Sequence, residues 1–171
     1  MKLSVILQNA YSKEQATQIV KWVGSNQQRF DELLHWFLSD DNKIVQRAAW
    51  PLSYCIAQHP QLINKHYDTL IAQLQASDKP SAVRRNILRA FDQIPQIPEK
   101  YHGIIMDACF RYIEDPEETI ASQAFALGIL AKLSKLYPEI RQELCTIIES
   151  RLPYATPAFK SRAKKILSGK W

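Results

Sequence analysis

A pattern of apolar residues recurs about every 38 residues, and this recurrence restricts the chain to folds built from one repeated unit. The copies occupy residues 40–52, 78–91, 115–128 and 156–167. Their apolar anchors are spaced 38, 37 and 39 residues apart, at Val45, Val83, Ile120 and Phe159. A period of roughly 20 to 50 residues is typical of arrays in which each unit packs on its neighbours. We therefore expect the 171 residues to form such an array, long enough for one domain with a substantial core.

Each copy has the spacing of an amphipathic helix. The fourth and seventh residues after each anchor are apolar, at Ala49 and Leu52, Ile87 and Ala90, Ala124 and Leu127, and Ala163 and Ile166. This spacing aligns three side chains on one helical face. A second apolar pair precedes each anchor, at Leu33-Leu34, Leu70-Ile71, Ala108-Cys109 and Ile147-Ile148, and belongs to an earlier helix. Each unit is therefore predicted to be a hairpin of two helices.

Residues that favour helix starts stand at the joints. Asp41 and Asp78 precede second helices, and Asp115-Pro116 and Thr156-Pro157 each pair a capping residue with a proline at the first helical position. Ser12 opens a capping box, and prolines at 60, 98 and 138 begin the first helices of later hairpins. The predicted helices span residues 12–24, 27–39, 42–58, 61–76, 80–94, 98–114, 116–136, 138–152 and 157–168, with a short turn over residues 2–9.

Pro51 interrupts the pattern of the first copy. Its counterparts in the other copies are Arg89, Ala126 and Lys165. Because proline has no N–H, the carbonyl of Arg47 loses its helical partner. We therefore predict a bend near residues 47–51.

A two-helix unit of 37 to 39 residues, with an acidic turn followed by a Val-Arg pair and spaced alanines, resembles the HEAT repeat, a member of the armadillo-like class. The best copy is 78–91, which contains Val83-Arg84. The resemblance implies an all-α fold, a right-handed α-α superhelix of about four HEAT-like helical hairpins plus an N-terminal capping helix. The expected organisation is a single HEAT-like domain over residues 1–171, with a cap over 1–26 and repeats over about 27–59, 60–96, 97–136 and 137–168.

The sequence offers no constellation typical of an enzyme. Glycine occurs only at positions 24, 103, 128 and 169, which excludes a glycine-rich phosphate loop. The four histidines lack the spacing of a metal site, and no G-x-S-x-G motif is present. Close acidic pairs such as Asp31-Glu32 and Asp40-Asp41 are explained by helix capping and dipole compensation. We therefore predict no catalytic residue, no metal and no cofactor.

The three cysteines, Cys55, Cys109 and Cys145, are widely separated, and we interpret them as small buried residues of a reducing compartment. The first residues lack a signal-peptide core, and the longest apolar run, residues 124–131, is shorter than the roughly 20 residues that span a bilayer. These features predict a cytoplasmic protein without a membrane segment. His35 and His66 are expected at the surface or at a helix rim.

Basic and polar residues gather on the second helices, which in a HEAT-like stack line the concave side. The candidate partner-binding residues are Arg47, Arg85, Asn86, Arg89, Gln123, Arg162 and Lys165. Trp50 is expected to pack between hairpins, the alternative being an aromatic that contacts a ligand. Solvated charge on helix faces is the structural alternative for the basic residues.

Two functions fit these residues and the net charge of +5. The first is a non-enzymatic scaffold that binds an acidic or extended segment of a protein partner on its concave face, with arginines pairing carboxylates. The second is a nucleic-acid-binding protein resembling DNA repair proteins with HEAT-like repeats, in which the same groove, with Arg162, Lys164 and Lys165, contacts phosphates. The oligomeric state stays open.

Overall fold

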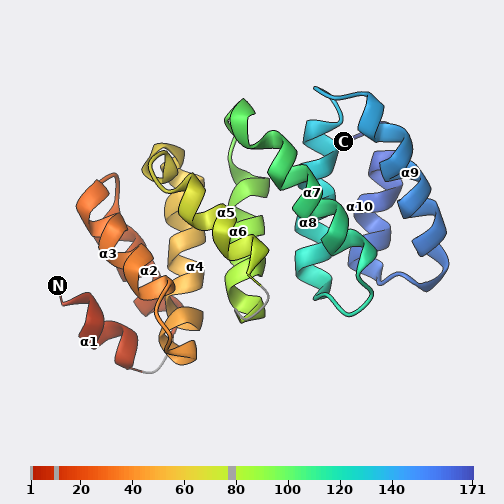
Figure 1. The fold of residues 1–171 in the computed structure, drawn as a ribbon. Coiled ribbons are helices and arrows are strands. Elements are labelled where there is room, and N and C mark those ends of the chain that lie inside the picture. Colours follow the sequence, from red (N-terminus) through yellow and green to blue (C-terminus); the bar gives the residue numbers. More distant parts are fainter. Residues whose placement is uncertain (1, 10–11, 77–79) are drawn as a thin grey trace. The chain divides into compact units, whose positions relative to one another are not determined.

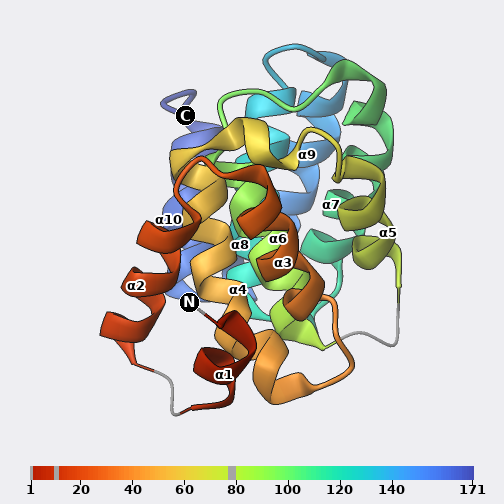
Figure 2. The same ribbon diagram turned by 90° about the vertical axis from the view of Figure 1, so that its left-hand side faces the viewer.

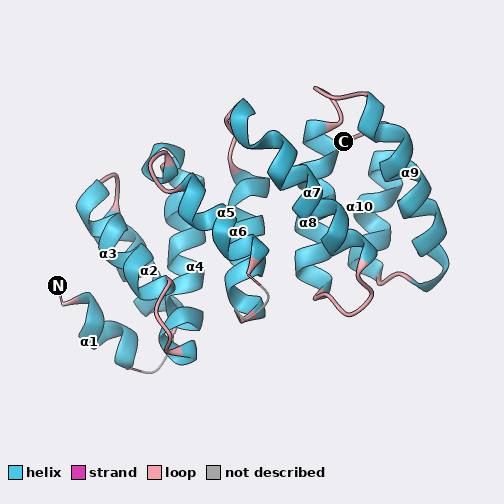
Figure 3. Ribbon diagram, in the orientation of Figure 1, coloured by secondary structure: helices cyan, strands magenta, loops and turns pink. Residues whose placement is uncertain are grey.

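The computed structural model describes residues 2–9, 12–76 and 80–171, and the described residues form helices and connecting turns without a strand (Figure 3). The chain separates into two compact units, unit 1 over Met1–Pro95 and unit 2 over Gln96–Trp171. The expectation of a single domain with four repeats and a cap stays a prediction. Among the described residues no helix is both long and apolar enough to cross a membrane.

Unit 1 contains six of the described α-helices, α1 (Leu3–Gln8), α2 (Lys13–Val23), α3 (Gln27–Phe37), α4 (Asn42–Gln58), α5 (Tyr67–Gln75) and α6 (Ser81–Gln93), and the 3-10 helix η1 (Pro60–Ile63). Helix α4 is central, because α1, α2, α3 and α6 all pack against it, while α5 packs against α6 (Figure 1). Helix α3 packs on α4 and α5 on α6, which agrees with the predicted pairing of these helices into hairpins.

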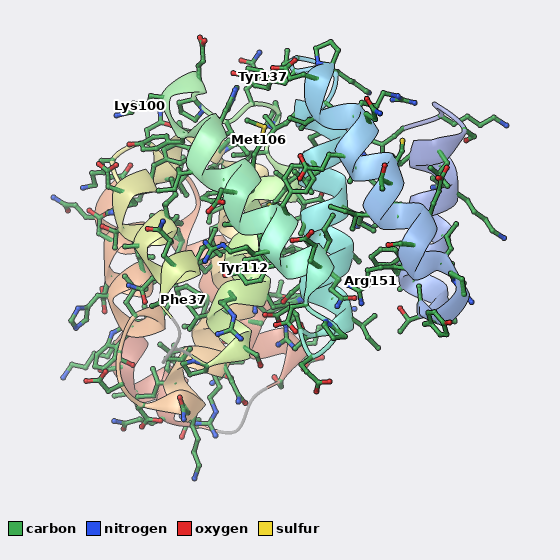
Figure 4. The ribbon with its side chains drawn as sticks, turned by 45° about the vertical axis from the view of Figure 1, so that its right-hand side comes forward. Phe37, Lys100, Met106, Tyr112, Tyr137 and Arg151 are labelled. Atoms are coloured by element: carbon green, nitrogen blue, oxygen red, sulfur yellow. The ribbon has the colours of Figure 1, made fainter. Side chains whose placement is uncertain are left out.

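Unit 2 contains α7 (His102–Glu114), α8 (Ile120–Leu133), α9 (Glu139–Arg151) and α10 (Pro157–Leu167), with the 3-10 helices η2 (Glu99–Tyr101) and η3 (Leu152–Tyr154). Helix α8 packs on both α7 and α10, and α9 packs on α10. Ten of the fourteen residues of α8 are buried, as expected for a helix that is apolar on every side. Figure 4 shows Tyr137, which precedes α9, and Arg151, at the end of α9, at opposite ends of this unit.

Three of the predicted caps are confirmed by hydrogen bonds. The Ser12 hydroxyl accepts from the Gln15 amide, the Asp41 carboxylate accepts from the amides of Lys43 and Ile44, and the Thr156 hydroxyl accepts from the Phe159 amide. These side chains satisfy amides that the first helical turn leaves without partners. The predicted cap at Asp78 lies outside the described residues.

The predicted start of α8 is wrong. Asp115 ends α7, and its carboxylate accepts from the Glu117 amide within the connecting turn. The N-cap of α8 is Thr119, whose hydroxyl accepts from the Ser122 amide. Thr119 supplies the same capping chemistry four residues later, so Pro116 lies in the turn and not at the first helical position.

The anchor stripes form the core with one exception. Val45, Val83 and Phe159 are buried, as are the apolar residues four and seven positions after each anchor. Ile120, the anchor of the third copy, is 52% exposed, because α8 begins at this residue and its side chain has no preceding turn to cover it. Cys55 and Cys109 are buried as predicted, whereas Cys145 is only half-buried.

Two predicted first helices begin with a 3-10 segment. The helix expected over 61–76 is divided into η1 and α5, separated by a turn at residues 64–66, and the helix expected from residue 98 starts with η2. Helix α4 continues through Pro51 from Asn42 to Gln58. The bend near residues 47–51 stays a prediction.

Candidate partner-binding groove

Helices α4 and α6 turn polar faces away from the core of unit 1. On α4, Lys43, Gln46, Arg47 and Trp50 follow the spacing i, i+3, i+4, i+7, which places them on one helical face. On α6, Arg85 and Arg89 are four residues apart and share a face in the same way. The buried stripes on the opposite faces fix both orientations, because Val45 and Val83 point into the core.

A groove of about 590 Å³ opens along these two faces. Its polar lining consists of Lys43, Gln46, Arg47, Arg85, Asn86 and Arg89. Ala49 and Trp50 complete the lining. Four of these side chains are cationic and none is a carboxylate, so the lining carries a net positive charge, which favours anionic ligands.

Arg47 is partly committed to the fold. One terminal nitrogen, Nη1, donates to the carbonyl oxygens of Leu7 at 2.9 Å and Gln8 at 2.8 Å, the last two residues of α1. A helix leaves its last carbonyls without partners, and a cation there also opposes the helix dipole. Arg47 thereby fastens α1 to α4, and Figure 2 shows α1 beside the first half of α4.

Arg89 is held by an aromatic pair on α4. Its guanidinium carbon lies 4.9 Å from the centroid of the Tyr54 ring, and the rings of Tyr54 and Trp50 are 4.1 Å apart between centroids. Trp50 and Tyr54 are half-buried, so both rings keep an accessible surface. A cation over an aromatic face is stabilised by the ring quadrupole, which favours this position of the Arg89 guanidinium along the groove.

The two other candidates of unit 1, Arg85 and Asn86, differ in exposure and in hydrogen bonding within the fold. Arg85 is exposed and, within the part of the chain that the structure describes, forms no ion pair. Asn86 is buried, and its amide nitrogen donates one hydrogen bond to the carbonyl of Ala82 at 2.8 Å, so part of its hydrogen-bonding capacity is used within α6.

The three candidates in unit 2 do not form a comparable cluster. Gln123 is 5% exposed, and its amide nitrogen donates to the carbonyl of Asp115 at 2.6 Å, which closes the turn between α7 and α8. The guanidinium of Arg162 lies over the rings of Phe125, at 5.5 Å, and Trp171, at 5.3 Å. Lys165 is exposed on α10. Gln123 therefore has a structural role, and only Lys165 is fully accessible.

Other titratable groups hold the fold together. The Asp31 carboxylate accepts from Lys65 and His66, both at 2.7 Å, and from Gln27 at 2.9 Å. Burial alone would raise the pKa of Asp31, but the hydrogen bonds from Lys65, Gln27 and His66 outweigh burial and lower the pKa. Asp31 lies inside α3 and joins it to the start of α5, so its interpretation as a cap or dipole group is wrong.

Two further groups with functional potential are buried. Burial raises the pKa of the Cys55 thiol to about 12, so it is protonated at neutral pH and unsuited to act as a nucleophile. In unit 2, His102 is 6% exposed and both ring nitrogens are used, one at 2.8 Å from the Tyr137 hydroxyl and one at 2.7 Å from the Ile97 carbonyl. Among the described residues no group of three or more His, Cys, Asp or Glu side chains is placed to hold a metal ion.

Sequence reasoning missed Lys43 and Gln46 and treated Trp50 mainly as a packing residue. The helical stripe that runs from Lys43 through Gln46 and Arg47 to Trp50 is a signal that could have found them. Tyr54, one turn further, extends the same face. The role of Asn86 and Gln123 as buried donors has no signal in their spacing.

Comparisons with known proteins agree on the fold. The family model of the HEAT repeat domain matches residues 3–170. A search of curated proteins finds no match. A crystal structure described as that of an engineered protein superposes with a TM-score of 0.62 at 19% identity, covering 99% of this chain and 79% of that chain. At this identity the likeness concerns the fold alone. With the family model spanning nearly the whole of an all-helical chain, the protein belongs to the HEAT repeat family.

Proposed function

We propose that this protein is an interaction module that holds a segment of a partner protein in the groove on α4 and α6. The observation that carries the proposal is the groove itself, about 590 Å³ in volume, with four cationic side chains and no carboxylate in its lining. Stacked helical hairpins generally serve as extended binding surfaces, which supports this choice. Arg47, Arg85, Asn86 and Arg89 line the groove and belong to the proposed site, whereas Gln123 is left out because it is not part of this lining.

Binding would depend on preorganisation. Arg89 is already positioned by Tyr54, and one nitrogen of Arg47 is fixed by α1, so little rotamer freedom is lost when a ligand arrives. Arg85 is exposed and presents its planar fork to solvent, where it can bind a carboxylate through two parallel hydrogen bonds. The fold supplies a rigid shape, and no chemical step is needed.

The test is affinity capture from a lysate of the native host, with and without nuclease treatment, with the bound proteins identified by mass spectrometry. The groove variant is Arg85→Glu/Arg89→Glu. The matched control is Lys13→Glu/Lys21→Glu, which reverses two exposed charges on α2, outside the groove lining. We expect the same proteins on the wild type and the control, and their loss from the groove variant. Retention by the groove variant would overturn the proposal.

A second candidate is binding to nucleic acid, because proteins that bind single strands combine cations with aromatic rings, as Arg89, Tyr54 and Trp50 do here. Such binding weakens steeply as the salt concentration rises. If neither duplex nor single-stranded oligonucleotides bind at low ionic strength, this candidate is eliminated.

A further inference from the structure

We propose that the groove selects an acidic peptide segment that carries an aromatic side chain next to its carboxylates, a specificity that rests on the proposed function. Carboxylates would bind at Arg85 and Lys43, and the aromatic ring would bind at Trp50. The two subsites differ in chemistry, so each can be tested by itself.

The carboxylate subsite follows from the accessibility of the cations. Lys43 and Arg85 are exposed and lie on facing helices of the groove. Arg47 already donates to two carbonyls, and Arg89 lies over Tyr54, so these two are less free to follow a ligand. With no acidic side chain in the lining, an incoming carboxylate meets no like charge.

The aromatic subsite follows from Trp50. Its indole is only half-buried and lines the groove together with Arg85 and Arg89 of α6. Tyr54 supports the indole from the next turn, and Arg89 covers Tyr54. A ligand ring packed on the indole would gain apolar contact and an offset or edge-on aromatic interaction. Tryptophan and arginine, which both line this groove, are also among the residues that most often dominate binding energy at protein interfaces.

The extent of the cationic surface favours a peptide over nucleic acid. A volume of about 590 Å³ is that of a pocket for a few side chains. A nucleic-acid strand needs phosphate contacts along an extended track. In repeat register, Arg85 and Arg89 correspond to Ser122 and Ala126 on α8, and both of these are buried and uncharged. The paired arginines therefore belong to one repeat.

The experiment measures fluorescence anisotropy with three labelled decapeptides and one oligonucleotide. The first peptide has glutamates around a central Phe, the second replaces that Phe by Ala, and the third replaces the glutamates by Gln. The oligonucleotide is a ten-nucleotide thymidine strand. With the unsubstituted 171-residue chain we expect the first peptide to bind about tenfold more tightly than the second and at least tenfold more tightly than the third and the oligonucleotide.

The variants assign each preference to its subsite. Trp50→Ala should remove the difference in affinity between the Phe and Ala peptides while the preference for glutamates remains. Trp50→Leu keeps apolar volume at this position and should have the same effect, so it serves as the test if the alanine variant unfolds. Arg85→Glu should weaken both acidic peptides at least tenfold, and Lys21→Glu should weaken neither.

Equal binding of the Phe and Ala peptides by the wild type would overturn the aromatic subsite, and tighter binding of the oligonucleotide would assign the groove to nucleic acid. If no peptide binds but Arg85→Glu/Arg89→Glu still abolishes capture of the partner protein, this inference fails and the proposed function stands. If capture is also unaffected, both fail.

Discussion

Arg47→Ala should loosen α1 from the rest of unit 1. This helix has six residues, Leu3–Gln8, too few to be stable alone, because an isolated helix in water needs roughly 12 to 15 residues. It is held by the burial of Leu3 and Leu7 and by side-chain donors at its C-terminal end. Those donors are Arg47, which binds two carbonyls, and Gln15, which donates to the carbonyl of Ile6.

The magnitude follows from the two bonds of Arg47. A hydrogen bond that involves a charged group stabilises by about 1.5–3 kcal/mol, and solvent exposure reduces this value. The bond to Leu7 is partly buried and the bond to Gln8 is exposed. Together they should contribute about 2 kcal/mol to the closed state of α1. Because about 1.4 kcal/mol corresponds to a factor of ten, the opening equilibrium of α1 should rise about 30-fold.

The assay is native-state hydrogen exchange of the α1 amides, with urea unfolding as a second measurement. Arg47→Lys keeps the charge but lacks the planar fork, so its effect should be smaller than that of Arg47→Ala. Arg85→Ala is the control on the same groove, and with no partner among the described residues it should change stability by less than about 0.5 kcal/mol.

Unchanged protection of α1 in Arg47→Ala would refute this reasoning, since it would show that Leu3 and Leu7 hold the helix without the two bonds. An equal effect of Arg85→Ala would also refute it, because the change would then reflect the loss of any groove cation and not the contact with α1. Protection that falls in α1 while α5 and α6 keep theirs is the expected result.

Three further predictions concern the fold. Asp31→Asn should lower the free energy of unfolding by about 1 kcal/mol at pH 7. Because folding lowers the pKa of Asp31, the stabilisation by its carboxylate is present above the unfolded pKa of about 3.9 and is lost as the pH falls through the folded pKa. The unfolding free energies of the wild type and the variant, measured with urea, should therefore converge in acid. Thr119→Ala should lower the free energy of unfolding by about 1 kcal/mol, whereas Pro116→Ala should change it by less than about 0.5 kcal/mol. If thermal unfolding shows the larger effect for Pro116→Ala, Asp115-Pro116 is the start of α8 after all. His102→Ala should lower the free energy of unfolding by about 2–4 kcal/mol, because the Tyr137 hydroxyl and the Ile97 carbonyl lose this hydrogen-bond partner. A change under about 0.5 kcal/mol in urea unfolding would contradict a structural role for this histidine.

The repeat and its helices could be read from the sequence because the forces involved are local. Apolar residues at helical spacing must share a face, and capping residues satisfy amides only two or three positions away, as at Asp41 and Thr156. The start of α8 was predicted wrongly at Asp115, because Asp115 and Thr119 can both cap a helix and residue spacing does not rank them. The helical face of Arg85 and Arg89 was likewise visible in the sequence.

What each of these side chains contacts was decided by the tertiary structure. Arg47 reaches carbonyls 39 and 40 residues away, and Asp31 binds partners 34 and 35 residues away. Such contacts depend on which helices become neighbours and on how deeply a side chain is buried, and neither follows from a periodic pattern. Gln123 illustrates this, because its place on a polar-looking face gave no sign that burial would direct its amide to the Asp115 carbonyl. The sequence by itself thus determined the helices and their hairpins, and only packing separated the cations that bond within the fold, such as Arg47, from those that stay exposed, such as Arg85.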